Sequence, residues 1–331
     1  MIADIAMFET QEAGQAEPGR RQTIPVTNGE VVDDNIYLIG RPTLSRFLRF
    51  MAHQTIDGES QDEGALTEEW RAANEHVRTL EKDEAGLADH PPITKLGPRL
   101  ESLYAALLAD PLVVNGFNTL PSNVGMVELD RMVVYQKHID LAHVNRLKDK
   151  LGPSPGEEEV FRTCLPADHP QPPFKWSRVH NDTYVFMSPS NDLRFLRPMR
   201  LEPCHIKDHP LPGSLVGVLG IAVGFGSNFL NAIYAENRLV LHNGSHRAYA
   251  LRELGVTHVP CIIQYASCRE ELDVVASGDL RDRPDVYLRS PRPSMLKDYF
   301  DPQLRKVVPV RRRLRQVTVK FEVDEAYVPA L

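Results

Sequence analysis

The chain has 331 residues, of which 42% are hydrophobic and 25% are charged, a composition typical of one large or two ordinary globular domains. Its formal net charge of −7 argues against a protein whose whole surface coats nucleic acid, but leaves room for a local basic patch. No stretch approaches the ~20 apolar residues that cross a bilayer, so no membrane association is expected. The opening residues 1–21 lack a basic region before their short apolar piece, so we predict no secretory signal.

Cysteine usage favours a reducing compartment. The four cysteines are widely spaced and form no C-x-x-C pair, which indicates free thiols and a cytoplasmic location (Cys164, Cys204, Cys261 and Cys268). The stretch "CHIKDHP" at 204–210 combines metal-ligand residue types, but a closed zinc site needs a partner cluster that the sequence does not offer. We therefore interpret it as a polar loop and predict no metal site there.

The first third of the chain predicts a disordered tail over 1–34 and a helical subdomain over 35–125. Residues 10–34 are polar and lack apolar periodicity. A helix beginning near Pro42 is indicated by an apolar stripe at i, i+3, i+4 and i+7 (Leu44, Phe47, Leu48 and Met51). A second helix places Leu66 to Leu80 on one face and ends near Gly86, and a third is expected over 97–110.

Residues 126–268 change character and predict alternating strands and helices. A strand over 132–139 precedes a helix capped by Asp140. A proline-rich insertion is expected at 152–182, followed by short strands in 183–189 and 192–203. The next apolar, glycine-rich segment gives no clear periodicity. A hairpin turning at Glu236-Asn237, a helix over 245–255 and a buried strand over 258–266 complete an α+β (or α/β) core.

The C-terminal extension, 269–331, contains a strongly basic segment over 305–320. One interpretation is nucleic-acid binding through its arginine cluster (Arg311, Arg312, Arg313 and Arg315). The alternation of Val317, Val319 and Phe321 with polar residues favours a charged edge strand, which needs no ligand. Before it, residues 290–304 predict a proline-started helix that would direct Arg292 and Lys297 toward a ligand site.

The segment between the hairpin and the helix carries the most chemistry. A tight turn into a helix leaves main-chain N–H groups directed at one point, where the helix dipole favours an anion. Gly244 would let an oxyanion approach the backbone, Ser245 can cap the helix or donate its hydroxyl, and Arg247 offers a planar charged fork. The predicted phosphate site is the five-residue run Asn243, Gly244, Ser245, His246 and Arg247.

This run and its flanks resemble the ParB/sulfiredoxin-like superfamily over roughly 229–265. The matching elements are the strand Leu239–Leu241, the turn 243–247, Leu254-Gly255 and Val259-Pro260. The resemblance implies a ParB/sulfiredoxin-like core that holds a nucleoside triphosphate, with ATP as the first candidate and Mg²⁺ bridging its phosphates. Sulfiredoxins carry a catalytic cysteine where Ser245 stands, so repair of a sulfinic acid is not expected.

Two other branches of the superfamily also differ from this chain. ParB clamps have Gly-Glu-Arg-Arg and a following helix-turn-helix, whereas this chain has Gly-Ser-His-Arg. Serine kinases come nearer, but the acid that precedes their turn would fall at Asn243, which cannot act as a base. Candidate catalytic groups are therefore His242, Asn243 and Glu202, and the sequence does not rank a base among His242, Glu202, Asp182 and Glu236.

The preferred hypothesis is a nucleotide-binding protein, in its enzyme form a phosphotransferase acting on a small-molecule acceptor. The alternatives are a ParB-like DNA-associated protein, either a CTP-dependent clamp or a nuclease, and a non-catalytic interaction domain.

Overall fold

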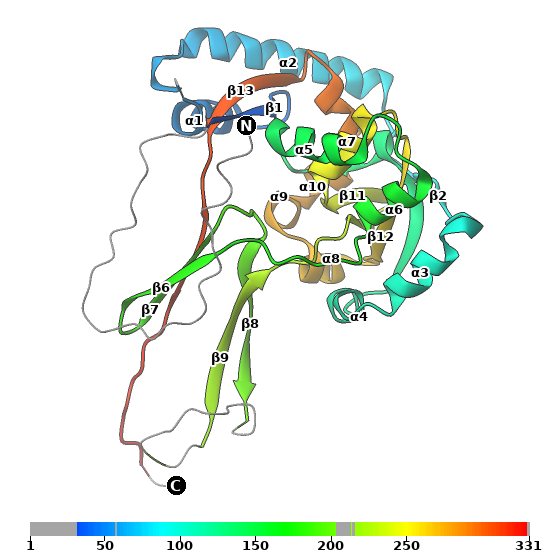
Figure 1. Cartoon of the computed structure of the whole chain (residues 1–331). Helices are drawn as coiled ribbons and strands as arrows, with labels where there is room; N and C mark the ends of the chain where they lie inside the picture. Colours follow the sequence, from blue (N-terminus) through cyan, green and yellow to red (C-terminus); the bar gives the residue numbers. More distant parts are fainter. Residues whose placement is uncertain (1–31, 57, 203–212, 214–215, 330–331) are drawn as a thin grey trace. The chain divides into compact units, whose positions relative to one another are not determined.

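The computed structural model describes residues 32–329 apart from 57, 203–212 and 214–215 (Figure 1). The chain divides into two compact units. The described part of the first, here called the core unit, comprises 32–169 and 227–312, and that of the second, the strand unit, comprises 170–226 and 313–329. The mixed α+β class expected from the sequence is confirmed. The expected boundaries at 35–125, 126–268 and 269–331 do not coincide with these units.

The core unit begins with a strand where the sequence predicted the end of a disordered tail and the start of a helical subdomain. This strand, β1 (Val32–Leu38), is the middle strand of a three-stranded antiparallel sheet with the order β13-β1-β5. Its register pairs Val32 with Arg311 and Ile36 with Ile139. The expected helices follow β1 as α1 (Leu44–Gln54) and α2 (Glu63–Asp83). Because β1 pairs with β13 (Arg305–Arg311), this helical segment begins beside a strand from the C-terminal part of the chain.

The expected apolar stripe of α1 packs as its periodicity requires. Phe47 and Met51 are fully buried and join Tyr37 of β1, Leu66 and Ala73 of α2 in one cluster. Asp62 caps α2 by accepting a hydrogen bond from the Gly64 N–H group. The third expected helix, 97–110, is present as a 3₁₀ turn, η2 (Pro98–Leu100), followed by α3 (Glu101–Leu108). A further short helix, α4 (Pro111–Gly116), has proline at its first position, where the missing N–H group costs no hydrogen bond.

A six-stranded mixed sheet forms the centre of the core unit, with the order β2-β3-β12-β10-β11-β4. The expected hairpin is confirmed, with its turn at Glu236 and Asn237, both at positive φ. The strands are β2 (Ile93–Thr94), β3 (Ser122–Glu128), β4 (Val133–Val134), β10 (Asn231–Ala235), β11 (Arg238–Asn243) and β12 (His258–Tyr265). The single strand expected over 132–139 is instead two, β4 and β5 (His138–Asp140), which belong to different sheets.

Helices cover both faces of this sheet, which explains its nearly continuous apolar strands. Leu239 and Leu241 of β11 pack into the larger core, whereas Val240 between them packs into a second cluster on the opposite face. The larger core includes α5 (Leu141–Leu151), α6 (Glu157–Cys164), α7 (Ser245–Glu253) and η5 (Leu296–Phe300). The opposite face is covered by α8 (Arg269–Val275), α9 (Gly278–Asp282) and α10 (Pro284–Leu288).

The strand unit is built from antiparallel β structure. One sheet has the order β14-β7-β6 and the other pairs β8 with β9 (Figure 1). Its strands are β6 (Lys175–His180), β7 (Thr183–Ser188), β8 (Leu193–Leu201), β9 (Val218–Phe225) and β14 (Arg315–Lys320). The Arg315 Nε group donates to the Leu193 carbonyl at 3.2 Å and so connects the two sheets. The basic segment thus contains the strand expected from its alternation.

Candidate phosphate-binding turn

The turn between β11 and α7 has the geometry that its glycine predicts. Gly244 lies between the strand and the helix with φ 98° and ψ 19°, in the left-handed region that favours glycine. A Cβ atom at this position would lie 3.2 Å from the Leu230 Cα atom, so the close approach of two main chains also requires glycine. Because glycine has no side chain, the first turn of α7 is not capped by the residue at its N-cap position.

Asn243, at the end of β11, holds the neighbouring main chain. Its Nδ2 group donates to the Ser227 and Phe229 carbonyls at 3.0 and 3.2 Å. A β-bulge places Asn231 opposite Asn243, and the Asn231 Nδ2 group donates to the same Phe229 carbonyl at 3.1 Å. Asn231 is buried, and its Oδ1 atom has no hydrogen-bond partner within the described ranges. The sequence did not single out this amide.

Arg247 is directed at the protein's own backbone. Its Nη1 group donates to the Asn228 carbonyl at 2.6 Å and to the Thr163 and Cys164 carbonyls at 3.2 Å each. Only 7% of the residue is exposed. The guanidinium thus joins the end of α6 to the segment that enters β10, and the structure gives Arg247 a role that the sequence did not predict. Burial raises the pKa of the Cys164 thiol to about 12, so this cysteine supplies no thiolate.

His246 lies against other histidines. Its ring centroid is 5.2 Å from that of His143 in the first turn of α5, in an edge-to-face arrangement. The His246 Nε2 atom is buried and has no hydrogen-bond partner in the described part of the chain. Burial, followed by the nearby His143, His138 and Arg247, lowers the pKa of His246 to about 3. His246 is therefore neutral at pH 7.

The candidate bases are differently placed. His242 accepts or donates a hydrogen bond through Nδ1 with the Tyr135 hydroxyl, 3.1 Å away, and that hydroxyl also lies 3.2 Å from the His242 carbonyl. Glu236 lies in the hairpin turn at the other end of the six-residue strand β11, roughly 20 Å from Asn243. There it pairs with Arg269 at 2.6 Å. His242 is the candidate base in the core unit that adjoins the turn.

Glu202 and Asp182 belong to the strand unit. Glu202 follows β8 and lies 3.8 Å from Arg200, while Asp182 accepts a hydrogen bond from the Thr183 hydroxyl at 3.1 Å. The "CHIKDHP" loop at 204–210 lies outside the described residues.

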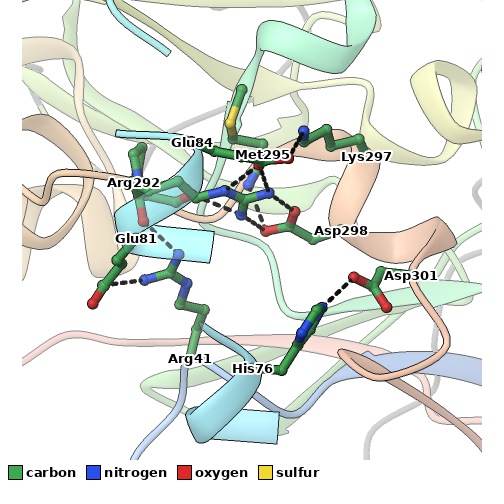
Figure 2. A network of polar contacts seen from close by, with 10 residues as sticks. Arg41, His76, Glu81, Glu84, Arg292, Met295, Lys297, Asp298 and Asp301 are labelled. Atoms are coloured by element: carbon green, nitrogen blue, oxygen red, sulfur yellow. Dashed lines mark hydrogen bonds and ion pairs between the residues drawn. The ribbon is translucent and has the colours of Figure 1, made fainter. Parts of the chain in front are cut away.

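The expectation that Arg292 and Lys297 reach the ligand site is wrong, because both belong to an internal ion-pair network (Figure 2). Arg292, 1% exposed, donates to both Asp298 carboxylate oxygens at 2.5 and 2.6 Å and to Glu84 Oε2 at 3.0 and 3.1 Å. Lys297 donates to Glu84 Oε1 at 2.7 Å. The segment forms the short 3₁₀ helix η5 rather than a proline-started helix, and it joins α2 to the centre of the core unit.

The arginine cluster proposed for nucleic acid is partly occupied by internal contacts. Arg312 forms a two-point ion pair with Asp33, with distances of 2.6 and 2.7 Å. Arg311 donates to the Ile56 carbonyl at 3.3 Å, and Arg315 donates to Leu193 as described above. Arg313 also has a partner. These contacts fix the ends of β13 and β14.

The histidine pair at the turn gives the protein an expected acid sensitivity. The folded state lowers the His246 pKa below the unfolded value of about 6.5, so protonation below pH 6.5 favours unfolding until the folded pKa near 3 is passed. Between pH 7.5 and 5.0, the wild type should therefore lose up to about 2 kcal/mol of its free energy of unfolding through His246, and the His246→Gln variant should not show this loss. Urea unfolding at the two pH values measures this difference. The exposed His258 provides the control variant His258→Gln, and an equal acid loss in all three proteins contradicts the assignment.

Among the described residues, no group of three or more His, Cys, Asp and Glu side chains is arranged to hold a metal ion. None of the described helices is long and apolar enough to span a membrane. No protein-family model matches the chain, and neither a curated protein nor a solved structure matches it significantly.

Proposed function

We propose that the protein binds a phosphorylated ligand, with a nucleoside triphosphate as the first candidate, at the N-terminus of α7. The observation that carries this proposal is the uncapped start of α7 after Gly244, together with two buried polar atoms that have no hydrogen-bond partner among the described residues, Asn231 Oδ1 and His246 Nε2. Helix N-termini present N–H groups and a positive dipole end to anions, and buried polar atoms are normally hydrogen-bonded. A bound phosphate would pair with the N–H groups at the start of the helix. The phosphate, its hydroxyl group or a metal ion bound to it would pair with the two buried polar atoms.

The roles within this site differ from those expected from sequence alone. Asn243 and Arg247 would position the turn by holding the backbone at 163–164 and 227–229. The phosphate would then be held by main-chain N–H groups after Gly244 and by the neutral His246 ring. Mg²⁺ prefers oxygen ligands and usually arrives with phosphates, so the amide oxygens of Asn231 and Asn243 would be its protein-side candidates.

The resemblance also supports phosphoryl transfer to a small-molecule acceptor, as a second part of the proposal. His242 would take the proton of the acceptor hydroxyl, whose oxygen forms the new bond to the γ-phosphorus as the bond to the nucleoside diphosphate breaks. The hydrogen bond between His242 and Tyr135 would fix the imidazole orientation. Phosphoryl transfer requires the phosphate site at the start of α7, whereas phosphate binding at that site does not require phosphoryl transfer.

Thermal unfolding with ATP, CTP and GTP, each with magnesium, tests the binding proposal. A ligand at one hundred times its Kd stabilises the folded state by about 2.7 kcal/mol, which raises Tm by roughly 5–10 °C. Ser245→Glu should abolish the shift, because a carboxylate at the helix start occupies and repels the phosphate position. Ser267→Glu, which places the same charge beside α8, should leave the shift unchanged. Failure of all three nucleotides at millimolar concentration rejects the proposal.

A further inference from the structure

The strands of the strand unit carry charge of one sign. Together β6, β7, β8, β9 and β14 contain seven lysine and arginine residues and no aspartate or glutamate. The seven are Lys175, Arg178, Arg194, Arg197, Arg200, Arg315 and Lys320. The whole chain, in contrast, has a net charge of −7. The acidic residues of the described strand unit lie in turns and flanking segments, where Asp192 pairs with Arg194 and Glu202 lies near Arg200. The described residues of this unit carry eight lysine and arginine residues against six aspartate and glutamate residues, a balance of +2 in an acidic chain that favours an anionic partner.

One face of the sheet β14-β7-β6 carries a row of aromatic side chains. The register sets Trp176 opposite Phe186 and Arg178 opposite Tyr184. Adjacent rings along the row Phe186, Trp176, Tyr184 and Phe321 have centroids 6.4 Å apart. Trp176 is 58% exposed and Phe321 45% exposed. The Arg178 guanidinium lies 5.8 Å from the centre of the Tyr184 ring, so charge and aromatic surface adjoin on the same face.

The aromatic row is not part of a hydrophobic core within its own unit. Of the hydrophobic side chains described in the strand unit, Leu193 alone is buried. Exposed apolar residues also lie on β8 and β9, among them Phe195, Leu196, Leu219 and Ile221. The adjoining rings of the aromatic row form the kind of exposed apolar surface that generally marks a binding site.

We propose that the strand unit binds single-stranded nucleic acid, with the phosphates along its basic side chains and bases stacked on Trp176 and Phe321. Proteins that bind single strands combine a positive surface with aromatic rings on which successive bases stack. A duplex keeps its bases stacked internally and offers no base faces to such rings. A second copy of the chain is a poorer occupant, because a symmetric strand-to-strand contact would set the arginines of β8 near one another. This activity is separate from the phosphate site of the core unit.

Tryptophan fluorescence allows a direct test, because the chain has only two tryptophans. Trp70 lies on α2 in the core unit, and Trp70→Phe leaves Trp176 as the sole reporter. Titration with a 20-nucleotide oligo(dT) or oligo(U) should quench this fluorescence at 50 mM salt, and the two arms distinguish DNA from RNA. A blunt duplex of the same length should bind at least tenfold more weakly. No quenching by either single strand, or equal affinity for the duplex, overturns the proposal.

Charge and ring variants separate the two parts of the surface, with anisotropy of a labelled oligonucleotide as the readout. The triple change Arg197→Gln, Arg200→Gln and Lys320→Gln should reduce the magnitude of the slope of log affinity against log salt by about 2, because each lost phosphate contact reduces it by roughly 0.7. A matched triple change at exposed core-unit positions, Lys95→Gln, Arg99→Gln and Lys150→Gln, should leave the slope unchanged. Trp176→Ala should weaken binding roughly 5- to 150-fold.

The competing occupant gives a different result in the same set of variants. If the surface joins two copies of the chain, analytical ultracentrifugation will show a dimer that the Trp176→Ala and triple-charge variants dissociate, and oligonucleotide binding will be absent. That result overturns the proposal. Unfolded variants are recognised by circular dichroism, and Trp176→Phe, which keeps a ring, should then retain affinity within about threefold of wild type.

Discussion

Arg292→Met is expected to lower the free energy of unfolding by about 3–5 kcal/mol. The change leaves Asp298, which is 2% exposed, as a buried carboxylate without the guanidinium that donates to both of its oxygens. Glu84 loses the same partner and keeps only Lys297. A buried charge deprived of its partner is strongly destabilising, because desolvation is no longer offset by attraction. The effect should extend to α2, which this network joins to η5 within the core unit (Figure 2).

Chemical unfolding of the wild type and variant measures this effect, with Arg78→Ala as the matched control. Arg78 forms an ion pair of 2.9 Å with Glu75, but both side chains are about 70% exposed. An exposed pair of this kind contributes little, so Arg78→Ala should change stability by less than about 0.5 kcal/mol. The double variant Arg292→Met with Asp298→Leu should recover part of the loss, since no buried charge is left alone. A loss below 1 kcal/mol for Arg292→Met would show that the network is not structurally important.

Arg247→Ala is expected to destabilise the protein by about 3 kcal/mol, with or without nucleotide. The change removes a charged donor from the Thr163, Cys164 and Asn228 carbonyls. The buried Cys164 carbonyl keeps the Leu230 N–H group at 2.7 Å, and Asn228 is exposed, so the loss is that of the charged hydrogen bonds themselves. A hydrogen bond to a charged group contributes about 1.5–3 kcal/mol, and the remaining partners keep the total below the sum of three. Arg247→Lys should recover only part of the loss, because an ammonium group cannot reproduce the fork geometry.

Denaturation of Arg247→Ala beside Arg252→Ala separates a structural role from a ligand role. Arg252 lies on the same helix and makes two hydrogen bonds of 3.1 Å to Asp130, but about a third of each side chain is exposed. Its loss should cost less than about 1 kcal/mol. If Arg247→Ala keeps wild-type stability and loses only nucleotide binding, its guanidinium is a phosphate ligand and the role assigned from the contacts is incorrect.

Local patterns in the sequence predicted the elements that depend on local physics. The stripe Leu44 to Met51, the cap at Asp140 and the turn at Glu236-Asn237 each rest on interactions within a few residues, and all three are present. The position of Gly244 between strand and helix follows from the same local reasoning. The phosphate site itself, and the nucleotide it would hold, stay predictions.

Features that depend on distant pairing could not be predicted in this way. β1 has a polar start and pairs with a strand almost 280 positions later, so no local signal marks it. Asn231 faces Asn243 only because of a β-bulge, whereas simple counting from the hairpin turn places His242 opposite Asn231. The direction of Arg247 depends on carbonyls at 163–164, far away in sequence. The positions of Arg292 and Lys297 depend on Glu84 in the same way.

The pairing of β1 with β13 has a consequence for the order of folding. Val32 meets Arg311, and Asp33 is held by Arg312, so the central strand of the three-stranded sheet lacks one neighbour until nearly the entire chain has been synthesised. At roughly 5–20 residues per second, about 14–56 s separate the emergence of the two strands from the ribosome. During that interval one edge of β1 is available to other chains. We therefore expect the nascent protein to depend on chaperones and the completed one to fold slowly, as long-range pairing generally requires.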